Sequence, residues 1–200
     1  MLASLARLSA LALATALFAA SADPTEAAGL TGLSADEQPT NASYVAERVP
    51  TLAPMSHVML CMERPGECSR TPRADAVVAL VGDRRAELER INRMVNRTIR
   101  PRREAGPVDR WVLAPREGDC DDYAVTKRHR LIAMGWPASA LRLAVVRTPN
   151  GQGHAVLVVK TTEGDLVLDN RTSRIKLWSD TGLRWVKIQS SRDPRRWFAL

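Results

Sequence analysis

The sequence predicts an α+β fold in which helices come first and an antiparallel sheet follows. Between residues 73 and 99, apolar side chains recur at helical spacing with arginine and glutamate between them, the pattern of an amphipathic helix. Beyond residue 140 the pattern changes to short segments rich in β-branched residues that partly alternate, as strands do. Because helices and strands occupy separate stretches of the chain, we expect an α+β architecture.

The first 22 residues have the pattern of a secretory signal peptide. Arg7 is their only charged residue, a largely apolar stretch follows it, and Ala20-Ser21-Ala22 offers a small-x-small cleavage site. The stretch is too short to span a bilayer, so we expect export to the periplasm. Residues 23–53, rich in Ala, Pro, Thr, Ser and Asp, are expected to form a flexible arm, and residues 54–200 a single folded domain.

The number of cysteines and the net charge indicate a disulfide, a free thiol and no nucleic-acid partner. Three cysteines in an oxidising compartment leave one unpaired. Cys61 and Cys68 lie close together around the turn residues Pro65-Gly66, so we expect them to form a disulfide and Cys120 to remain a free thiol. The formal net charge is +7, but the arginines are dispersed and no nucleic-acid-binding motif frames them. We therefore expect no nucleic-acid partner, and we expect a monomer.

The helices have local signals. Gly82 and Asp83 predict a break that divides the stretch from 73 to 99 into two helices. Another helix is predicted from about residue 120 to 134, where Gly135 ends it. This helix is the element that carries the free cysteine.

Two aromatic residues lie outside the predicted helices and strands. Trp111, in the connection after the first helices, is assigned to the core, although its indole could also line a site beside Cys120. His57, just before Cys61, is interpreted as a packing or surface histidine rather than a catalytic one.

Four short strands are predicted to form an antiparallel meander, over residues 141–147, 154–160, 165–169 and 183–189. In a hairpin with a two-residue loop, Lys160 would face Asp165 across the second and third strands. His154 and Asp169 would then lie on one face as diagonal neighbours, about 7 to 8 Å apart and within side-chain reach.

The stretch from Gly118 to Ala124 brings a cysteine and three aspartates together at a helix start. A thiol in the first turn faces unsatisfied backbone N–H groups and the positive end of the helix dipole, and both favour the thiolate. If this helix packs on the face that carries His154 and Asp169, Cys120 gains a base and an orienting carboxylate. The structural alternatives are that Cys120 is a small buried residue and that the aspartates only cap the helix. In the same way, His154 could be a packed strand histidine and Asp169 could start a turn.

Several blocks in this order resemble a known family: Gly118 to Ala124, Gly135-Trp136-Pro137, Leu141-Arg142-Leu143, Gly153 to Leu157 and Leu166 to Asn170. They are similar to the bacterial transglutaminase-like cysteine peptidases, in particular the LapG-like periplasmic proteases. The resemblance implies a papain-like fold, a catalytic triad of Cys120, His154 and Asp169, and calcium at Asp119 and Asp121. No organic cofactor is implied.

The same resemblance implies a protein substrate, such as a surface adhesin or another exported protein, and a regulatory protein of the inner membrane. Two other functions are consistent with the residues. The acyl-enzyme could be resolved by an amine, as in a transglutaminase or amidase, because the triad alone does not distinguish water from amine. Alternatively, Asp119, Asp121 and Asp122 could hold a cation in a binding module without catalysis.

Overall fold

The computed structural model describes residues 43–70, 74–103 and 109–200 of the chain. Within these ranges the helices are α1 (Met55–Glu63), α2 (Arg84–Thr98) and α3 (Cys120–Ala133), with short 3-10 turns η1 (Pro65–Cys68), η2 (Ala138–Ala140) and η3 (Trp178–Asp180). The strands are β1 (Val49–Thr51), β2 (Arg100–Pro101), β3 (Glu117–Gly118), β4 (Leu141–Arg147), β5 (Gly153–Thr161), β6 (Gly164–Leu168), β7 (Lys176–Leu177), β8 (Arg184–Gln189) and β9 (Trp197–Ala199). The predicted α+β class is confirmed.

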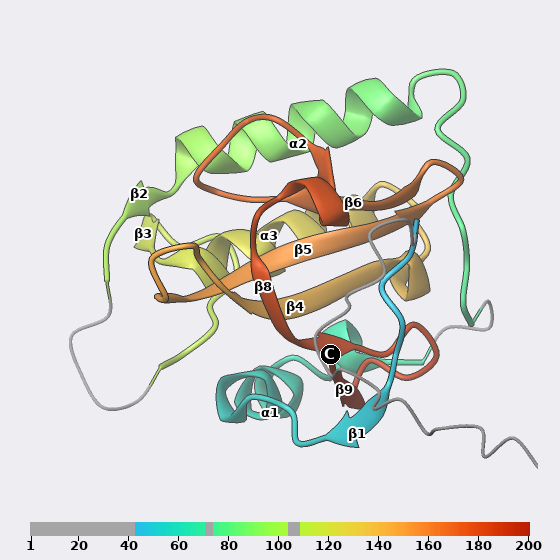
Figure 1. Cartoon of the computed structure of the whole chain (residues 1–200). Helices are drawn as coiled ribbons and strands as arrows, with labels where there is room; N and C mark the ends of the chain where they lie inside the picture. The colour runs from blue at the N-terminus through green and yellow to red at the C-terminus, as the bar shows by residue number, and fades with distance from the viewer. Residues whose placement is uncertain (1–42, 71–73, 104–108) are drawn as a thin grey trace, which may run out of the picture. The chain divides into compact units, whose positions relative to one another are not determined.

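The main sheet of the described residues has the strand order β1-β9-β8-β4-β5-β6-β7, and its neighbouring strands are antiparallel (Figure 1). The β5–β6 hairpin has the predicted register, since Lys160 faces Asp165 and Thr161 faces Gly164. The predicted meander is therefore correct for β4, β5 and β6. It is wrong for β8, which does not pair with β6. Strand β8 instead pairs with β4, along the edge opposite to β5.

The central strands β4 and β5 are apolar on both faces, so both faces of the sheet carry a core. One set of their side chains packs under α2 and α3, while Val146, Val156 and Val158 form a second core on the opposite face. Trp178 and Trp185, which come after β6, cover this second core. Each fully buried aliphatic side chain here contributes roughly 1.5 to 3 kcal/mol, so both faces of these strands need cover.

Residues 74–83 differ from the prediction, because α2 begins only at Arg84. Val78 instead forms a parallel bridge with Thr161, donating its N–H to the carbonyl of Lys160 at 3.0 Å. The segment has several valines, which favour extended backbone. Gly82, with a φ of 57°, makes the turn that separates this extended segment from α2.

Residues 43–53 were expected in the flexible arm, but they pack as part of the folded unit. Val45 is buried and its N–H donates to the Asp165 carboxylate at 2.7 Å. Strand β1 pairs with β9 at the edge of the sheet. The predicted signal peptide and the first part of the predicted arm, residues 1–42, lie outside the described residues. In the part of the chain that is described, no helix is long and apolar enough to cross a membrane.

The region around α1 is held by a disulfide and a cluster of rings. Cys61 and Cys68 form the predicted disulfide. His57 is buried between Trp111 and Trp197, with ring centroids 5.7 and 5.3 Å away, so both the packing role of His57 and the core assignment of Trp111 are confirmed. Burial, assisted by the charge of Arg128, lowers the pKa of His57 to about 4, which keeps the ring neutral.

Candidate active site

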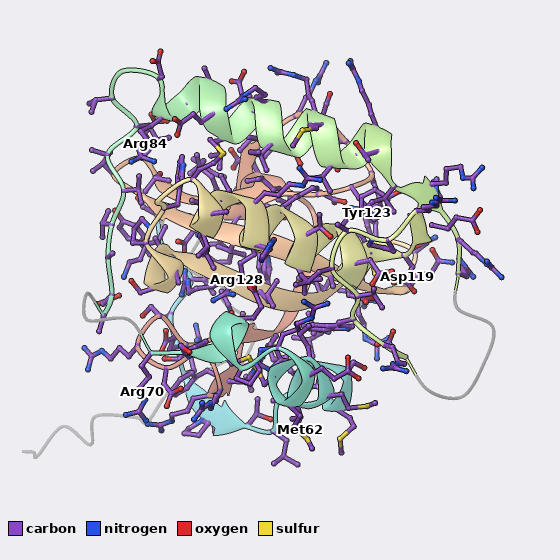
Figure 2. The ribbon with its side chains drawn as sticks, turned by 180° about the vertical axis from the view of Figure 1, so that it is seen from behind. Met62, Arg70, Arg84, Asp119, Tyr123 and Arg128 are labelled. Atoms are coloured by element: carbon purple, nitrogen blue, oxygen red, sulfur yellow. A yellow bond between two sulfur atoms is a disulfide. The ribbon has the colours of Figure 1, made fainter. Side chains whose placement is uncertain are left out.

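Cys120 is the first residue of helix α3, and a reciprocal pair of hydrogen bonds fixes this start of the helix. Asp119 is the N-cap, and the Asp119 and Asp122 side chains each accept a hydrogen bond from the other residue's backbone N–H, a capping box. Gly118 has no space for a side chain, since a Cβ there would lie 2.1 Å from the Asp122 Oδ2. Figure 2 shows Asp119 at one end of α3, which lies across the sheet.

His154 and Asp169 meet on one face of the sheet, as the register predicts. His154 is the second residue of β5, Asp169 directly follows β6, and the ring Nε2 lies 2.9 Å from the Asp169 Oδ1. Both side chains are almost fully buried. The two side chains therefore bridge the diagonal spacing of about 7 to 8 Å between their backbones and come into hydrogen-bond distance.

Arg171 also holds the Asp169 carboxylate, a contact that the sequence did not reveal. Its backbone N–H donates to Oδ1 at 2.9 Å, and its guanidinium donates to Oδ2 through Nη2 at 2.9 Å and Nε at 3.1 Å. Burial alone would raise the pKa of Asp169, but the hydrogen bonds from His154 and Arg171 hold it well below its usual range. The carboxylate is thus ionised and its orientation fixed. The turn signal Asp169-Asn170 was the sequence feature that could have pointed to this contact.

Cys120 and His154 line the same cleft, which has a volume of about 950 Å³. The backbone N–H of Ala155, the neighbour of His154, interacts favourably with the Cys120 thiolate. The structure therefore brings all three predicted residues together, with Cys120 and His154 open to one cleft. Other residues that line it are Pro101, Arg102, Arg103, Asp109, Gly118, Asp119, Thr148, Asn150, Gln152, Gly153, Asn170 and Arg171.

The thiol of Cys120 has an environment that opposes ionisation. Burial, followed by the charges of Asp121 and Asp119, raises the pKa of Cys120 to about 12, against the favourable backbone N–H groups of Ala155 and Asp121. The thiol lies 3.9 Å from the Asp121 Oδ1, to which it can donate. In this environment the thiol form prevails at neutral pH unless a further positive charge enters.

The carboxylates beside the thiol are suited to supply such a charge by binding a cation. Ligand atoms of Asp119, Cys120 and Asp121 lie within 4.8 Å of one another. Among the described residues, the Asp119 Oδ1 and Asp121 Oδ2 are buried without a hydrogen-bond partner. Burial, a hydrogen bond with Asp119 and the charges of Asp119, Asp109 and Asp122 raise the pKa of Asp121 to about 10. Hard, buried and unmatched carboxylate oxygens fit a calcium ion.

Comparison with known proteins gives a family and three similar structures. The family described as bacterial transglutaminase-like cysteine proteinase (BTLCP) matches residues 47–200. One solved structure of Legionella pneumophila LapG is 28% identical over 54% of this chain and 64% of the LapG chain, with a TM-score of 0.46. A calcium-bound form is 27% identical over 57% and 68%, with a TM-score of 0.49. An EGTA-treated form is 27% identical over 58% and 67%, with a TM-score of 0.47.

The aligned region thus spans about two thirds of the LapG chains, and slightly less of the first. No curated protein matches the chain. The family match covers more than half of the sequence and contains every residue of the site described above. The chain belongs to the bacterial transglutaminase-like cysteine proteinases.

Proposed function

We propose that this cysteine proteinase is exported and cleaves a peptide bond in a periplasmic or cell-surface protein, using Cys120 as nucleophile. The observation that carries the proposal is the His154–Asp169 pair, 2.9 Å apart, at a cleft that also contains the free thiol. A nucleophile, a base and a group that orients the base are the parts that covalent acyl transfer requires.

Each residue of the triad has a distinct role in this reaction. Asp169 accepts a hydrogen bond from the Nε2 of His154, which leaves Nδ1 for the thiol. Cys120 Sγ loses its proton to His154 and attacks the carbonyl carbon, and His154 then protonates the departing amine. The acyl-enzyme is hydrolysed by a water that His154 deprotonates. The backbone N–H of Cys120, at the start of α3, supplies part of the oxyanion stabilisation.

Asp119 and Asp121 would hold a calcium ion, whose charge would favour the thiolate of Cys120. The Asp121 Oδ1 lies 3.9 Å from the thiol sulfur, and one carboxylate charge at that separation disfavours the thiolate by roughly 4 kcal/mol at an effective dielectric of about 20. The two aspartates therefore add to burial, which is the largest cause of the raised pKa of Cys120. Neutralising them removes the electrostatic part of this obstacle, while the backbone N–H groups of Ala155 and Asp121 continue to favour the thiolate.

The proposed substrate is a surface adhesin or another exported protein, and the proposed regulator is a protein of the inner membrane. Both follow from the family resemblance and from the predicted signal peptide. A cleft of about 950 Å³ has room for several residues of an extended chain, so a protein substrate agrees with its size.

Proteomic mapping of new chain termini tests the proposal. The exported-protein fraction of the host would be incubated with wild type, Cys120→Ser and His154→Ala, each in calcium and in EGTA. We expect new termini only with wild type, and more of them in calcium. New termini that also form with Cys120→Ser would contradict the nucleophile. Adding a primary amine to the same reaction would reveal amide products if the acyl-enzyme is resolved by an amine.

A further inference from the structure

Large apolar side chains gather on one exposed surface of the described residues. Of the nine that are exposed there, five lie between Val49 and Met62, on strand β1, helix α1 and the connection between them. Leu52, Met55 and Met62 are the most exposed of these five, at 84%, 72% and 77%. Single exposed apolar residues are common, whereas a group of them marks a surface that contacts a protein or a membrane. We call this group the apolar ridge: Val49, Leu52, Met55, Val58 and Met62.

Helix α1 contributes three residues of the ridge and is largely apolar on both of its sides. Met55, Val58 and Met62 follow one another at intervals of three and four residues, the spacing that aligns side chains along one side of a helix. Apart from the buried His57, Glu63 is the only acidic or basic residue of the helix, and it is the last one. A helix at the surface usually has a polar outer side. The outer side of α1 therefore suits a partner that is itself apolar.

The inner side of α1 is fixed, so the ridge cannot turn into the protein. His57 packs against two tryptophan rings, Leu60 belongs to the main core, and Cys61 is held by the disulfide. Figure 1 shows α1 beside β1, and Figure 2 shows Met62 on the side of α1 that faces away from the sheet. The ridge is thus already arranged before any partner binds, which reduces the entropy lost on binding.

Cations flank the ridge. Arg48 directly precedes Val49, and Arg64 directly follows α1. Both arginines are exposed, and in the part of the chain that is described neither has an ion pair. Lys187 donates its Nζ to the Leu52 carbonyl at 3.0 Å, so its ammonium lies beside the ridge. The apolar side chains therefore have positive charge close to them.

The acidic residues of the same segment are already paired. Glu63 forms an ion pair with Arg110, and Glu67 forms one with Arg128 at 3.1 Å. Glu47 accepts a hydrogen bond from the backbone N–H of Ser191 at 2.7 Å, which directs it away from the ridge into a separate polar pocket. The charge that remains available beside the ridge is positive, and it complements an anionic partner.

We propose that the apolar ridge binds an anionic phospholipid surface, where it inserts at the boundary between headgroups and acyl chains while Arg48 and Arg64 lie beside the headgroup phosphates. A protein partner would need a pocket of matching shape, whereas flexible side chains such as methionine enter a fluid layer in any arrangement. The formal net charge of +7 also attracts the whole chain to an anionic surface. This inference does not depend on the proposed catalytic roles.

Binding through the ridge would bring the catalytic cleft close to the lipid surface. Ser56 of α1 donates its hydroxyl to the Asp109 Oδ2 at 2.9 Å, and Asp109 also lines the cleft. Helix α1 therefore adjoins the cleft. A protein that is anchored in the same membrane would meet the cleft while the enzyme is bound.

The test is co-sedimentation with vesicles of phosphatidylcholine, prepared with and without phosphatidylglycerol. The protein is purified after export and its mass is measured, because the apolar residues of a retained signal peptide would themselves bind lipid. We expect wild type to sediment with the vesicles that contain phosphatidylglycerol and much less with phosphatidylcholine alone. Binding should weaken as the salt concentration rises, because salt screens the attraction between the arginines and the phosphates.

The double variant Met55→Gln with Met62→Gln tests the apolar contribution. We expect its affinity for the anionic vesicles to fall at least tenfold, since full burial of one methionine side chain already corresponds to roughly that factor. Its melting temperature should equal that of wild type, because both side chains are exposed. Val77→Gln with Val81→Gln is the matched control, since these valines are exposed outside the ridge. It should bind as wild type.

The double variant Arg48→Gln with Arg64→Gln tests the charges. We expect its affinity for the anionic vesicles to fall about fivefold for each arginine removed. Its weak binding to phosphatidylcholine alone should not change, because those vesicles have no net charge.

Three results would overturn the inference. Wild type could remain in the supernatant with both kinds of vesicle, or the methionine variant could bind as tightly as wild type. Sedimentation velocity without lipid gives the third: a dimer that the methionine variant abolishes would show that the ridge joins two copies of the chain. If the methionine variant melts well below wild type, Leu52→Gln is measured in its place, and equal binding by that variant would also overturn the inference.

Discussion

At the scale of single residues, the environment of Cys120 has two opposing effects on the pKa of its thiol. The start of α3 favours a thiolate through backbone N–H groups and the helix dipole. Burial and the charges of Asp121 and Asp119 act in the opposite direction and are larger, since the pKa of Cys120 rises to about 12. The helix start therefore explains where the cysteine is, but not how it becomes reactive.

The first prediction is that calcium controls the ionisation of Cys120. In EGTA, the alkylation rate of wild type should remain low up to strongly alkaline pH, because the thiol pKa is about 12. Calcium should move the midpoint down by several pH units, since one unit corresponds to about 1.4 kcal/mol. The measurement is the pH profile of iodoacetamide alkylation, with Asp121→Asn as the variant that should not respond. Identical profiles in calcium and EGTA would argue against the site.

The second prediction concerns the stability of Asp121→Asn without calcium. The pKa of Asp121 is about 10 in the folded state and near 4 when unfolded, so between these pH values the folded state holds a proton that the unfolded state lacks. Stability then falls as pH rises through this window. In EGTA, Asp121→Asn should therefore melt at a higher temperature than wild type, and the difference should grow from pH 5 to pH 8.

In calcium the order should reverse, because wild type gains the binding energy of the ion and the variant does not. Asp119→Asn provides the comparison, since asparagine is also a good N-cap and the helix start is preserved. If both variants simply melt earlier in EGTA at every pH, the aspartates serve the helix alone.

At the scale of elements, the parts that could be predicted are those with local causes. The bounds of helix α3 were predicted to within one residue, because the residues that start and end it, Asp119 and Gly135, directly flank it in the sequence. The β5–β6 register was predicted because a tight loop determines it. The contact between His154 and Asp169 follows from that register. By contrast, residues 74–83 have apolar spacing that suits a helix, yet Val78 finds a bridge partner in Thr161 that local sequence does not reveal.

The third prediction tests the start of α3 as an element. In Gly118→Ala, the new Cβ would lie 2.1 Å from the Asp122 Oδ2. Asp122 cannot move freely, because its carboxylate accepts from the Asp119 and Val112 N–H groups and is buried. We expect a loss of roughly 1 to 3 kcal/mol in the free energy of unfolding, the usual cost of overpacking, together with slower Cys120 alkylation. Urea unfolding measures the first effect.

Gly66→Ala is the matched control, since a Cβ at Gly66 meets nothing within 4 Å. It should change neither the unfolding midpoint nor the alkylation rate. A Gly118→Ala protein as stable as this control would show that the capping box tolerates displacement of Asp122.

At the scale of the whole described unit, the features that the sequence did not reveal are those that depend on pairing between distant segments. Strand β8 pairs with β4, and no local signal specifies which edge of the sheet it joins. The edge strand β1 has only three residues and pairs with β9 near the C-terminus, so its composition resembles that of a mobile arm. The burial of Lys127 also arises only when the helices and the sheet come together.

The last prediction concerns how the disulfide supports the catalytic helix. Arg128, in the middle of α3, donates to the Glu67 carbonyl at 2.8 Å and to the Leu141 carbonyl at 3.0 Å, which joins the disulfide loop, α3 and β4 (Figure 2). Because Cys61 and Cys68 are seven residues apart, their bond closes a short loop. In the chain-entropy model, a loop of about eight residues contributes roughly 2.5 kcal/mol.

The double variant Cys61→Ala with Cys68→Ala should therefore lose about 2.5 kcal/mol of unfolding free energy, as measured by urea denaturation. Its Cys120 alkylation rate below the unfolding transition should equal that of wild type, because the disulfide contacts neither the thiol nor His154. Cys120→Ser, which keeps the disulfide, should unfold like wild type. If the double variant instead lost alkylation while still folded, the loop would be acting through Arg128 on the position of α3, and the disulfide would then belong to the machinery of the site.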